Sequence, residues 1–91
     1  MTEHDVMIYA LTSCGWCRKT KAWFEEERIP YKHADVDALD GEEAKAMAAE
    51  VERLSGGRRF PVVVIDGHVV VGYQPQKYAE HLGRTHAANE G

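Results

Sequence analysis

The sequence has few cysteines and no long apolar segment, and each absence excludes a class of protein. With only Cys14 and Cys17 in 91 residues, a framework of several disulfides is impossible. The longest apolar runs, residues 62–65 and 69–71, are far too short to cross a bilayer. The start of the chain has no basic stretch followed by an apolar one, so we expect no secretory signal peptide and a cytoplasmic protein.

Size and charge limit the organisation of the chain and its partners. Ninety-one residues suffice for one domain, and 44% hydrophobic with 29% charged residues is ordinary for a globular protein. The net charge of −4 argues against nucleic acid as the main partner. The apolar pattern stops near residue 83, so we expect one folded domain over residues 1–83 and a flexible C-terminal tail over residues 84–91.

The two cysteines lie three positions apart, directly after a short apolar run. If a helix begins at Cys14, the two residues share one face and their sulfurs can form a reversible disulfide. Cys14 then lies in the first turn, where free backbone N–H groups, the helix dipole and Arg18 favour the thiolate. We expect the pKa of Cys14 to fall below the free-thiol value of about 8.5. Cys14 is thus the predicted nucleophile, and Cys17 the thiol that resolves a mixed disulfide.

Other roles for the cysteines have less support. A closed zinc site needs four ligands, but the chain has no second C-x-x-C and its five histidines are scattered, so we expect no metal site within one chain. A structural disulfide would close too short a loop to remove much entropy from the unfolded state. Two buried, unreactive cysteines are the remaining alternative.

Hydrophobic periodicity predicts strands and helices in alternation. Strands are expected over residues 6–10, 31–36, 60–65 and 68–71, the last two joined by the hairpin turn Asp66-Gly67. Helices are expected over residues 15–28, from 41 to the stop at Ser55-Gly56-Gly57, and from Pro75 until Gly83. Asp40 and Glu43 are expected to form a capping box for the second helix.

The order of these elements is β-α-β-α-β-β-α, a βαβ unit followed by a helix, a hairpin and a last helix. Strands rich in valine and without alternation indicate a sheet that is covered on both faces. On the first helix, Cys17, Thr20, Trp23 and Phe24 are expected on the inner face, with Lys21 largely off it.

These features together resemble the glutaredoxins, the small branch of the thioredoxin fold. The resemblance covers about residues 6–83 and rests on the C-x-x-C that opens helix one, Pro61 at the start of the third strand, the hairpin, and Gly72 before the last helix. It implies an α/β, thioredoxin-like three-layer fold, with a four-stranded mixed sheet and helices on both faces.

The resemblance also implies a set of site residues. Pro61 would be a cis-proline beside Cys14, and the backbone of Phe60 would pair with a substrate like an added strand. An ordinary trans-proline that begins the strand is the alternative. The implied catalytic residues are Cys14 and Cys17, the residues that contact the substrate or glutathione are Trp16, Arg59, Phe60, Pro61, Gly72 and Tyr73, and Arg18 stabilises the thiolate.

The chain departs from the usual glutaredoxin pattern at the glutathione contacts. Leu11 stands where the family usually has a lysine for a glutathione carboxylate, and the turn over residues 71–75 lacks the acid that meets the glutathione amine. Losing a charged hydrogen bond typically costs about 1.5–3 kcal/mol. Arg58 or Arg59 could supply the missing cation, or they could be a solvated pair in a turn. Gly15-Trp16 replaces the common Pro-Tyr between the cysteines.

The resemblance implies an enzyme, a thiol–disulfide oxidoreductase that reduces protein disulfides or glutathione-mixed disulfides through a Cys14/Cys17 dithiol cycle. Such a protein serves electron transport and cell redox homeostasis, holds no tightly bound cofactor and takes glutathione as a candidate co-substrate. Its implied partners are disulfide-containing proteins or low-molecular-weight thiols, with no nucleic acid and no membrane, and we expect a monomer. The reductant is glutathione or a thioredoxin-reductase-type flavoenzyme. The turn Gly72-Tyr73-Gln74-Pro75 resembles redoxins that use the flavoenzyme.

The resemblance leaves two other functions open. Some glutaredoxins without the active-site proline bind a [2Fe–2S] cluster between two chains, each giving its first cysteine and a glutathione sulfur, and Gly15 removes that proline here. A binding module with an idle C-x-x-C is the other alternative.

Overall fold

Strand β1 (Val6–Ala10) lies inside the sheet, as its apolar sequence predicts. It pairs in parallel with β2 (Lys32–Asp35) and antiparallel with β3 (Val62–Ile65), and β3 pairs antiparallel with β4 (His68–Val71). The strand order β2-β1-β3-β4 gives a mixed, four-stranded sheet. The computed structural model describes residues 4–57 and 59–83, so the expected tail over residues 84–91 lies outside the described residues.

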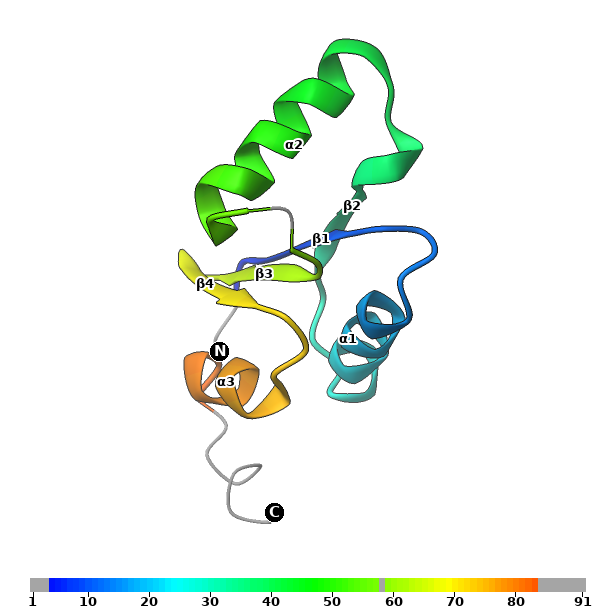
Figure 1. Ribbon diagram of the computed structural model, residues 1–91. Coiled ribbons are helices and arrows are strands. Elements are labelled where there is room, and N and C mark those ends of the chain that lie inside the picture. Colours follow the sequence, from blue (N-terminus) through cyan, green and yellow to red (C-terminus); the bar gives the residue numbers. More distant parts are fainter. Residues whose placement is uncertain (1–3, 58, 84–91) are drawn as a thin grey trace.

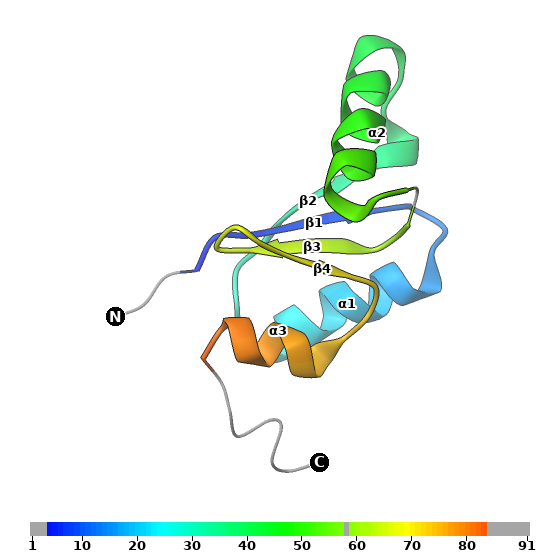
Figure 2. The same ribbon diagram turned by 60° about the vertical axis from the view of Figure 1, so that its left-hand side comes forward.

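Three helices cover the sheet on both faces. Helices α1 (Gly15–Glu26) and α3 (Pro75–His81) lie on one face and α2 (Gly41–Ser55) lies on the other (Figures 1 and 2). The predicted order of strands and helices and the three-layer α/β fold are confirmed, with one short 3-10 helix, η1 (Val36–Ala38), added after β2. Over the described residues, no helix has the length and apolar character to span a bilayer.

The main core lies between the sheet and the pair α1 and α3. Alternate residues of β1 face this side, and the register places Ile8 opposite Val63, so the inner faces of neighbouring strands align. The largest buried side chains here are Phe24 and Tyr78, whose ring centroids are 5.3 Å apart. Burying a large apolar side chain contributes about 1.5–3 kcal/mol, so this layer supplies much of the stability.

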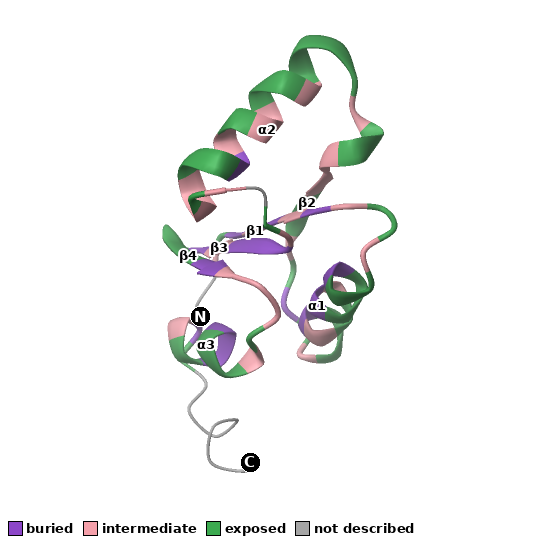
Figure 3. Cartoon of the chain, viewed as in Figure 1, coloured by how far each residue is buried: buried purple, intermediate pink, exposed green. Residues whose placement is uncertain are grey.

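The face toward α2 is covered more loosely. Val51 is the buried residue of α2, and most of the helix is exposed or half-buried (Figure 3). The α1 and α3 side therefore fixes the geometry of the sheet, and α1 carries both cysteines.

Helix α1 ends earlier than predicted. It was expected to continue to Arg28, but it stops at Glu26, and Arg28 adopts a left-handed backbone with φ of 61°. This reversal of the backbone lets the Ile29 N–H donate to the Phe24 carbonyl. The Ile29 side chain is buried in the core, and the helix does not continue through it.

Two strands are also shorter than predicted. The second was expected over residues 31–36, but it covers Lys32–Asp35 because the chain tightens into η1 at Val36. The third was expected from Phe60, but β3 begins at Val62, since Pro61 has no N–H to donate to a neighbouring strand.

The start of helix α2 differs from the predicted capping box. Asp40 occupies the N-cap position, but its side chain makes no capping hydrogen bond. The next residue, Gly41, has a positive φ of 63°, so the chain does not enter the helix with the backbone conformation that a capping box requires. Pro75 does open α3 as predicted.

The packing of β3 gives a stability prediction. Ile65 is wholly buried, so Ile65→Val should leave a small cavity and lower the free energy of unfolding by about 0.5–1.5 kcal/mol. Val69, 38% exposed on β4, is the matched control, and Val69→Thr should change stability by no more than about 0.5 kcal/mol. Urea unfolding measures both. Equal losses in the two variants would contradict the described core.

Candidate active site

Cys14 occupies the N-cap of helix α1 and is half-buried. Its Sγ accepts a hydrogen bond from the Cys17 backbone N–H at 3.2 Å, so the sulfur takes the place of a capping oxygen. The Cys14 N–H donates to the Leu11 carbonyl, and its own carbonyl accepts from the N–H of Arg18. The helix start predicted from the cysteine spacing is therefore confirmed, with a first-turn N–H directed at the sulfur.

Cys17 lies one turn deeper and is 1% exposed. Burial raises the pKa of Cys17 to about 12, and a hydrogen bond with the Cys14 side chain acts in the same direction. A backbone hydrogen bond with Leu11 and the positive charge of Lys21 have smaller, opposite effects. The two free thiols thus have different exposure and different surroundings. That Cys14 is the more acidic of the two stays a prediction.

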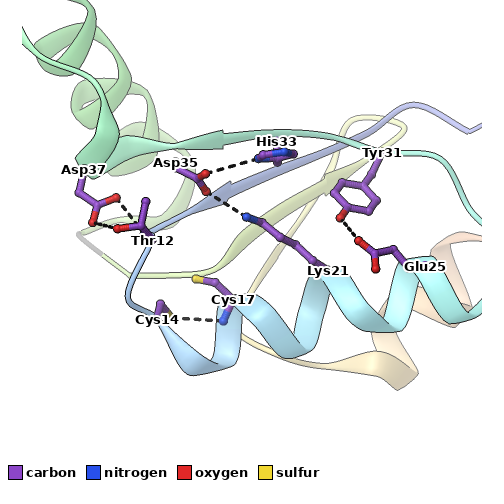
Figure 4. A network of polar contacts seen from close by, with 9 residues as sticks. All are labelled: Thr12, Cys14, Cys17, Lys21, Glu25, Tyr31, His33, Asp35 and Asp37. Carbon is purple, nitrogen blue, oxygen red and sulfur yellow. Dashed lines mark hydrogen bonds and ion pairs between the residues drawn. The ribbon is translucent and has the colours of Figure 1, made fainter.

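The loop before Cys14 is held by a carboxylate from another part of the chain. Asp37, in η1, accepts the Thr12 backbone N–H at 2.9 Å with Oδ1 and the Thr12 hydroxyl at 2.8 Å with Oδ2 (Figure 4). These hydrogen bonds hold the pKa of Asp37 below its usual range. The sequence analysis missed this contact because no local pattern pairs residues so far apart in the chain.

Pro61 faces the turn between β4 and α3. The Phe60–Pro61 peptide bond is cis, as the resemblance implied. The Pro61 carbonyl accepts the N–H of Gly72 at 2.7 Å. Gly72 has a φ of 92°, in the region that favours glycine, so this close approach depends on the residue type.

A buried tyrosine fixes that turn from inside the core. The Tyr78 hydroxyl, on α3, donates to the carbonyl of Gly72 and lies 3.3 Å from the Thr20 hydroxyl on α1. Because the single hydroxyl hydrogen of Tyr78 is used in the hydrogen bond to the Gly72 carbonyl, the Thr20 hydroxyl donates to the Tyr78 oxygen. The helix that carries the cysteines is thereby tied to the turn beside Pro61, a link that the sequence analysis did not foresee.

Most of the predicted substrate contacts come together around a small cleft of about 230 Å³, lined by Trp16, Phe60, Pro61, Gly72 and Tyr73. The rings of Trp16 and Tyr73 are 5.7 Å apart and tilted by 31°. Trp16 is 57% exposed, and the Lys19 ammonium group lies 5.0 Å from its ring centroid. The cleft therefore has an apolar, aromatic wall with a cation at its rim.

The predicted cations take no visible part in this cleft. Arg59 is exposed and is not among the residues that line the cleft. Arg18 is exposed on α1, so its role beside the thiolate stays a prediction. Arg58, the other candidate partner for a glutathione carboxylate, lies outside the described residues.

Lys21 is wrongly placed by the sequence analysis. It was expected largely off the inner face of α1, but its side chain is 22% exposed and its Nζ lies 3.0 Å from Asp35 Oδ1 on β2 (Figure 4). The long lysine stem covers apolar surface while the ammonium group meets a carboxylate, which a helical periodicity argument does not anticipate.

The described residues do not suit a metal centre held by this chain alone. Among residues 4–57 and 59–83, no three His, Cys, Asp or Glu side chains are grouped so that they could hold a metal ion. The iron–sulfur alternative that the resemblance leaves open uses two chains and glutathione, and neither Leu11 nor the turn over residues 71–75 carries the charge that the family usually offers to glutathione.

Comparison with known proteins gives consistent matches. A family model described as Glutaredoxin matches residues 6–70. An uncharacterized glutaredoxin-like 8.6 kDa protein in the rubredoxin operon of Clostridium pasteurianum is 31% identical over 68 residues, which cover 75% of this chain and 84% of that protein.

Two solved structures illustrate the range of the likeness. The glutaredoxin of Archaeoglobus fulgidus gives a TM-score of 0.81 at 32% identity, covering 86% of this chain and 85% of that one. The NrdH-redoxin of Escherichia coli, titled a glutaredoxin-like protein with a thioredoxin-like activity profile, gives 0.67 at 26% identity, covering 84% and 92%. The three-layer arrangement is thus shared with a glutaredoxin and with a glutaredoxin-like redoxin.

The Asp37 contact predicts a pH dependence of stability. The pKa of this carboxyl is lower in the folded chain than its unfolded value of about 3.9. The ionised carboxylate therefore stabilises the fold fully above about pH 4. This stabilisation is lost as the pH falls through the folded-state pKa. Asp37→Asn should therefore be less stable than the native chain at neutral pH, and the difference should shrink in acid. Urea unfolding over a pH series measures it. A difference independent of pH would contradict a role for the carboxylate.

Proposed function

The chain belongs to the glutaredoxin family, and from this premise we propose that it is a thiol–disulfide oxidoreductase with Cys14 as nucleophile and Cys17 as resolving thiol. The observation that carries the assignment of roles is the position of the two free thiols on α1, one capping the helix and half-exposed, the other buried one turn below. A substrate can reach Cys14 directly, whereas Cys17 is accessible to Cys14.

The proposed cycle has two exchange steps. In the first, the Cys14 thiolate attacks a substrate disulfide, forms a mixed disulfide and releases one substrate thiolate. In the second, Cys17 attacks Cys14 Sγ, releases the other substrate sulfur as a thiol and leaves a Cys14–Cys17 disulfide. The Cys17 N–H that caps Cys14 Sγ stabilises negative charge on that sulfur while it is the attacking thiolate of the first step.

We assign protein disulfides as the main substrates. The aromatic cleft beside Pro61 offers apolar contact, and the resemblance implies that the backbone of Phe60, just before the cis bond, pairs with a substrate chain like an added strand. Glutathione, by contrast, would meet Leu11 and a turn over residues 71–75 without an acid, where the resemblance places charged partners. Glutathione-mixed disulfides would accordingly be poorer substrates, by roughly 1.5–3 kcal/mol for each missing charged contact.

The same missing charges favour a thioredoxin-reductase-type flavoenzyme over glutathione as the reductant. The likeness to a redoxin with a thioredoxin-like activity profile supports this choice. We also propose that the protein is cytoplasmic, because a C-x-x-C with two unequal thiols suits a catalyst in a compartment where thiols are kept reduced. We propose that it is a monomer.

Single-cysteine variants test the assignment of roles. Cys14→Ser should abolish reduction of a protein disulfide such as insulin, because the attacking thiolate is removed. Cys17→Ser should still attack, and should accumulate as a covalent mixed disulfide that intact-mass spectrometry detects as the added substrate mass. Full turnover by Cys14→Ser, or trapping by Cys14→Ser rather than Cys17→Ser, would overturn the assignment.

The reductant is tested by comparing two coupled systems on the oxidised protein. We expect NADPH consumption with thioredoxin reductase to exceed that with glutathione and glutathione reductase by about tenfold or more, which corresponds to loss of roughly one charged contact. A glutaredoxin with charged glutathione contacts serves as the reference for the second system. Faster reduction by glutathione would contradict the proposed preference.

A further inference from the structure

The resolving step poses a problem that the two cysteines do not solve alone. The attacking species must be a thiolate, yet Cys17 is 1% exposed and burial raises its pKa to about 12. At neutral pH only a very small fraction of such a thiol is ionised. Some neighbouring group must therefore stabilise negative charge on Cys17 as it loses its proton.

The groups that face Cys17 come from three parts of the fold. On its own helix, Cys14 precedes it by three residues and Lys21 follows it by four, so both lie on its face of α1. Leu11, after β1, contributes a backbone hydrogen bond. Helix α3 contributes the buried hydroxyl of Tyr78, whose pKa is raised chiefly by burial and, to the smallest extent, by negative charge on Cys17. Of these, Lys21 carries the positive charge, and that charge lowers the pKa of Cys17.

The Lys21 side chain is held in place by β2. Its Nζ lies 3.0 Å from Asp35 Oδ1, and Asp35 Oδ2 lies 3.8 Å from His33 Nδ1 (Figure 4). The exposed fraction of the side chain is 22% for Lys21, 24% for Asp35 and 45% for His33. Because the Lys21 side chain is mostly shielded from solvent, the field of its charge on a buried neighbour is screened less than that of a surface lysine.

The next acid on the helix does not compete for this lysine. Glu25, one turn after Lys21, accepts the Tyr31 hydroxyl at 2.6 Å. The contact that fixes Lys21 is thus the one to Asp35 on the neighbouring strand, and it sets the ammonium group between the helix and β2, on the side of α1 that carries Cys17 (Figure 4).

We propose that Lys21, positioned by Asp35, stabilises the thiolate of Cys17 in the resolving step. This inference rests on the proposed dithiol cycle. Cys17 gives its proton to water, and its thiolate attacks Cys14 Sγ while the bond between Cys14 and the substrate sulfur breaks. The substrate sulfur leaves with the electron pair and takes a proton from water, so it is reduced while the two cysteines are oxidised. Lys21 keeps its proton throughout and supplies only charge.

The experiment separates attack from resolution on the reduced protein. A dithiobis-nitrobenzoate disulfide releases one coloured thiolate when Cys14 attacks it and a second when Cys17 resolves the mixed disulfide, so stopped-flow absorbance shows two phases. In Lys21→Met and Lys21→Gln, we expect the second phase to slow by about tenfold and its pH profile to move upward by about one unit, since one pKa unit is a factor of ten in ionised fraction. The first phase should be nearly unchanged.

Three comparisons make the result specific. Lys21→Gln keeps a hydrogen-bond donor for Asp35 without the charge, Lys21→Arg keeps the charge and should restore the second phase, and Asp35→Asn should slow it in part because Lys21 loses its anchor. Lys32→Met is the matched control, since Lys32 is an exposed lysine on the same strand as Asp35. Circular dichroism and the unfolding midpoint check that each variant is folded.

The possible outcomes either support or overturn the inference. Selective slowing of the second phase in the Met and Gln variants, with recovery in Arg, supports it. An unchanged second phase, equal slowing of both phases, or the same slowing in Lys32→Met overturns it. Failure of the native chain to show a first phase would instead contradict the role of Cys14 in the proposed function.

Discussion

The hydrogen bond from the Cys17 N–H to Cys14 Sγ is the contact on which the site depends. It can form only because the helix begins one residue after Cys14, so that the sulfur replaces a capping oxygen. The same geometry places Cys17 on the inner face, where it is buried. One helix start thus creates two chemically different thiols from residues of the same type.

The surrounding fold holds this helix start from two sides. Asp37, in η1 directly after β2, holds the loop before Cys14 through its hydrogen bonds with Thr12. Tyr78, arriving from the last helix, ties α1 to the turn that faces Pro61. Both contacts join parts of the chain that are distant in sequence, so the active-site loop is ordered only once the sheet and both helices of that face are assembled.

Much of the fold could be predicted from the sequence because its signals are local. The run of residues 6–10, the Asp66-Gly67 turn and Pro75 at a helix start each depend on the conformational preferences of a few adjacent residues. The errors arose where a tertiary contact decides the outcome. Ile29 turns inward and ends α1 early, and Gly41 removes the expected cap of α2.

The site divides in the same way. The spacing of Cys14 and Cys17 predicted the helix start and led to the proposed chemistry, and the resemblance implied the cis bond at Pro61 and most of the residues that line the aromatic cleft. The contacts of Lys21 and Asp37 could not be recognised, because each residue has its partner on another part of the fold. A charged residue on a helix is usually solvent-exposed, and only the packed structure shows which lysine is covered.

The recognition surface combines apolar contact with little fixed charge. Trp16 and Tyr73 form one wall of the cleft, while Leu11 and the turn over residues 71–75 lack the charges that the family usually offers to glutathione. A surface of this kind agrees with the proposal that protein disulfides are the main substrates, because it would discriminate by shape and by backbone pairing more than by ion pairs.

The most direct test of this account is the alkylation of the reduced native protein by limiting iodoacetamide near neutral pH, with the modified cysteine identified by peptide mass spectrometry. The account predicts that Cys14 is modified and that Cys17 stays unmodified until the chain is unfolded in denaturant, because one thiol is open at a helix start and the other is buried. Equal modification of the two cysteines in the folded protein would contradict it.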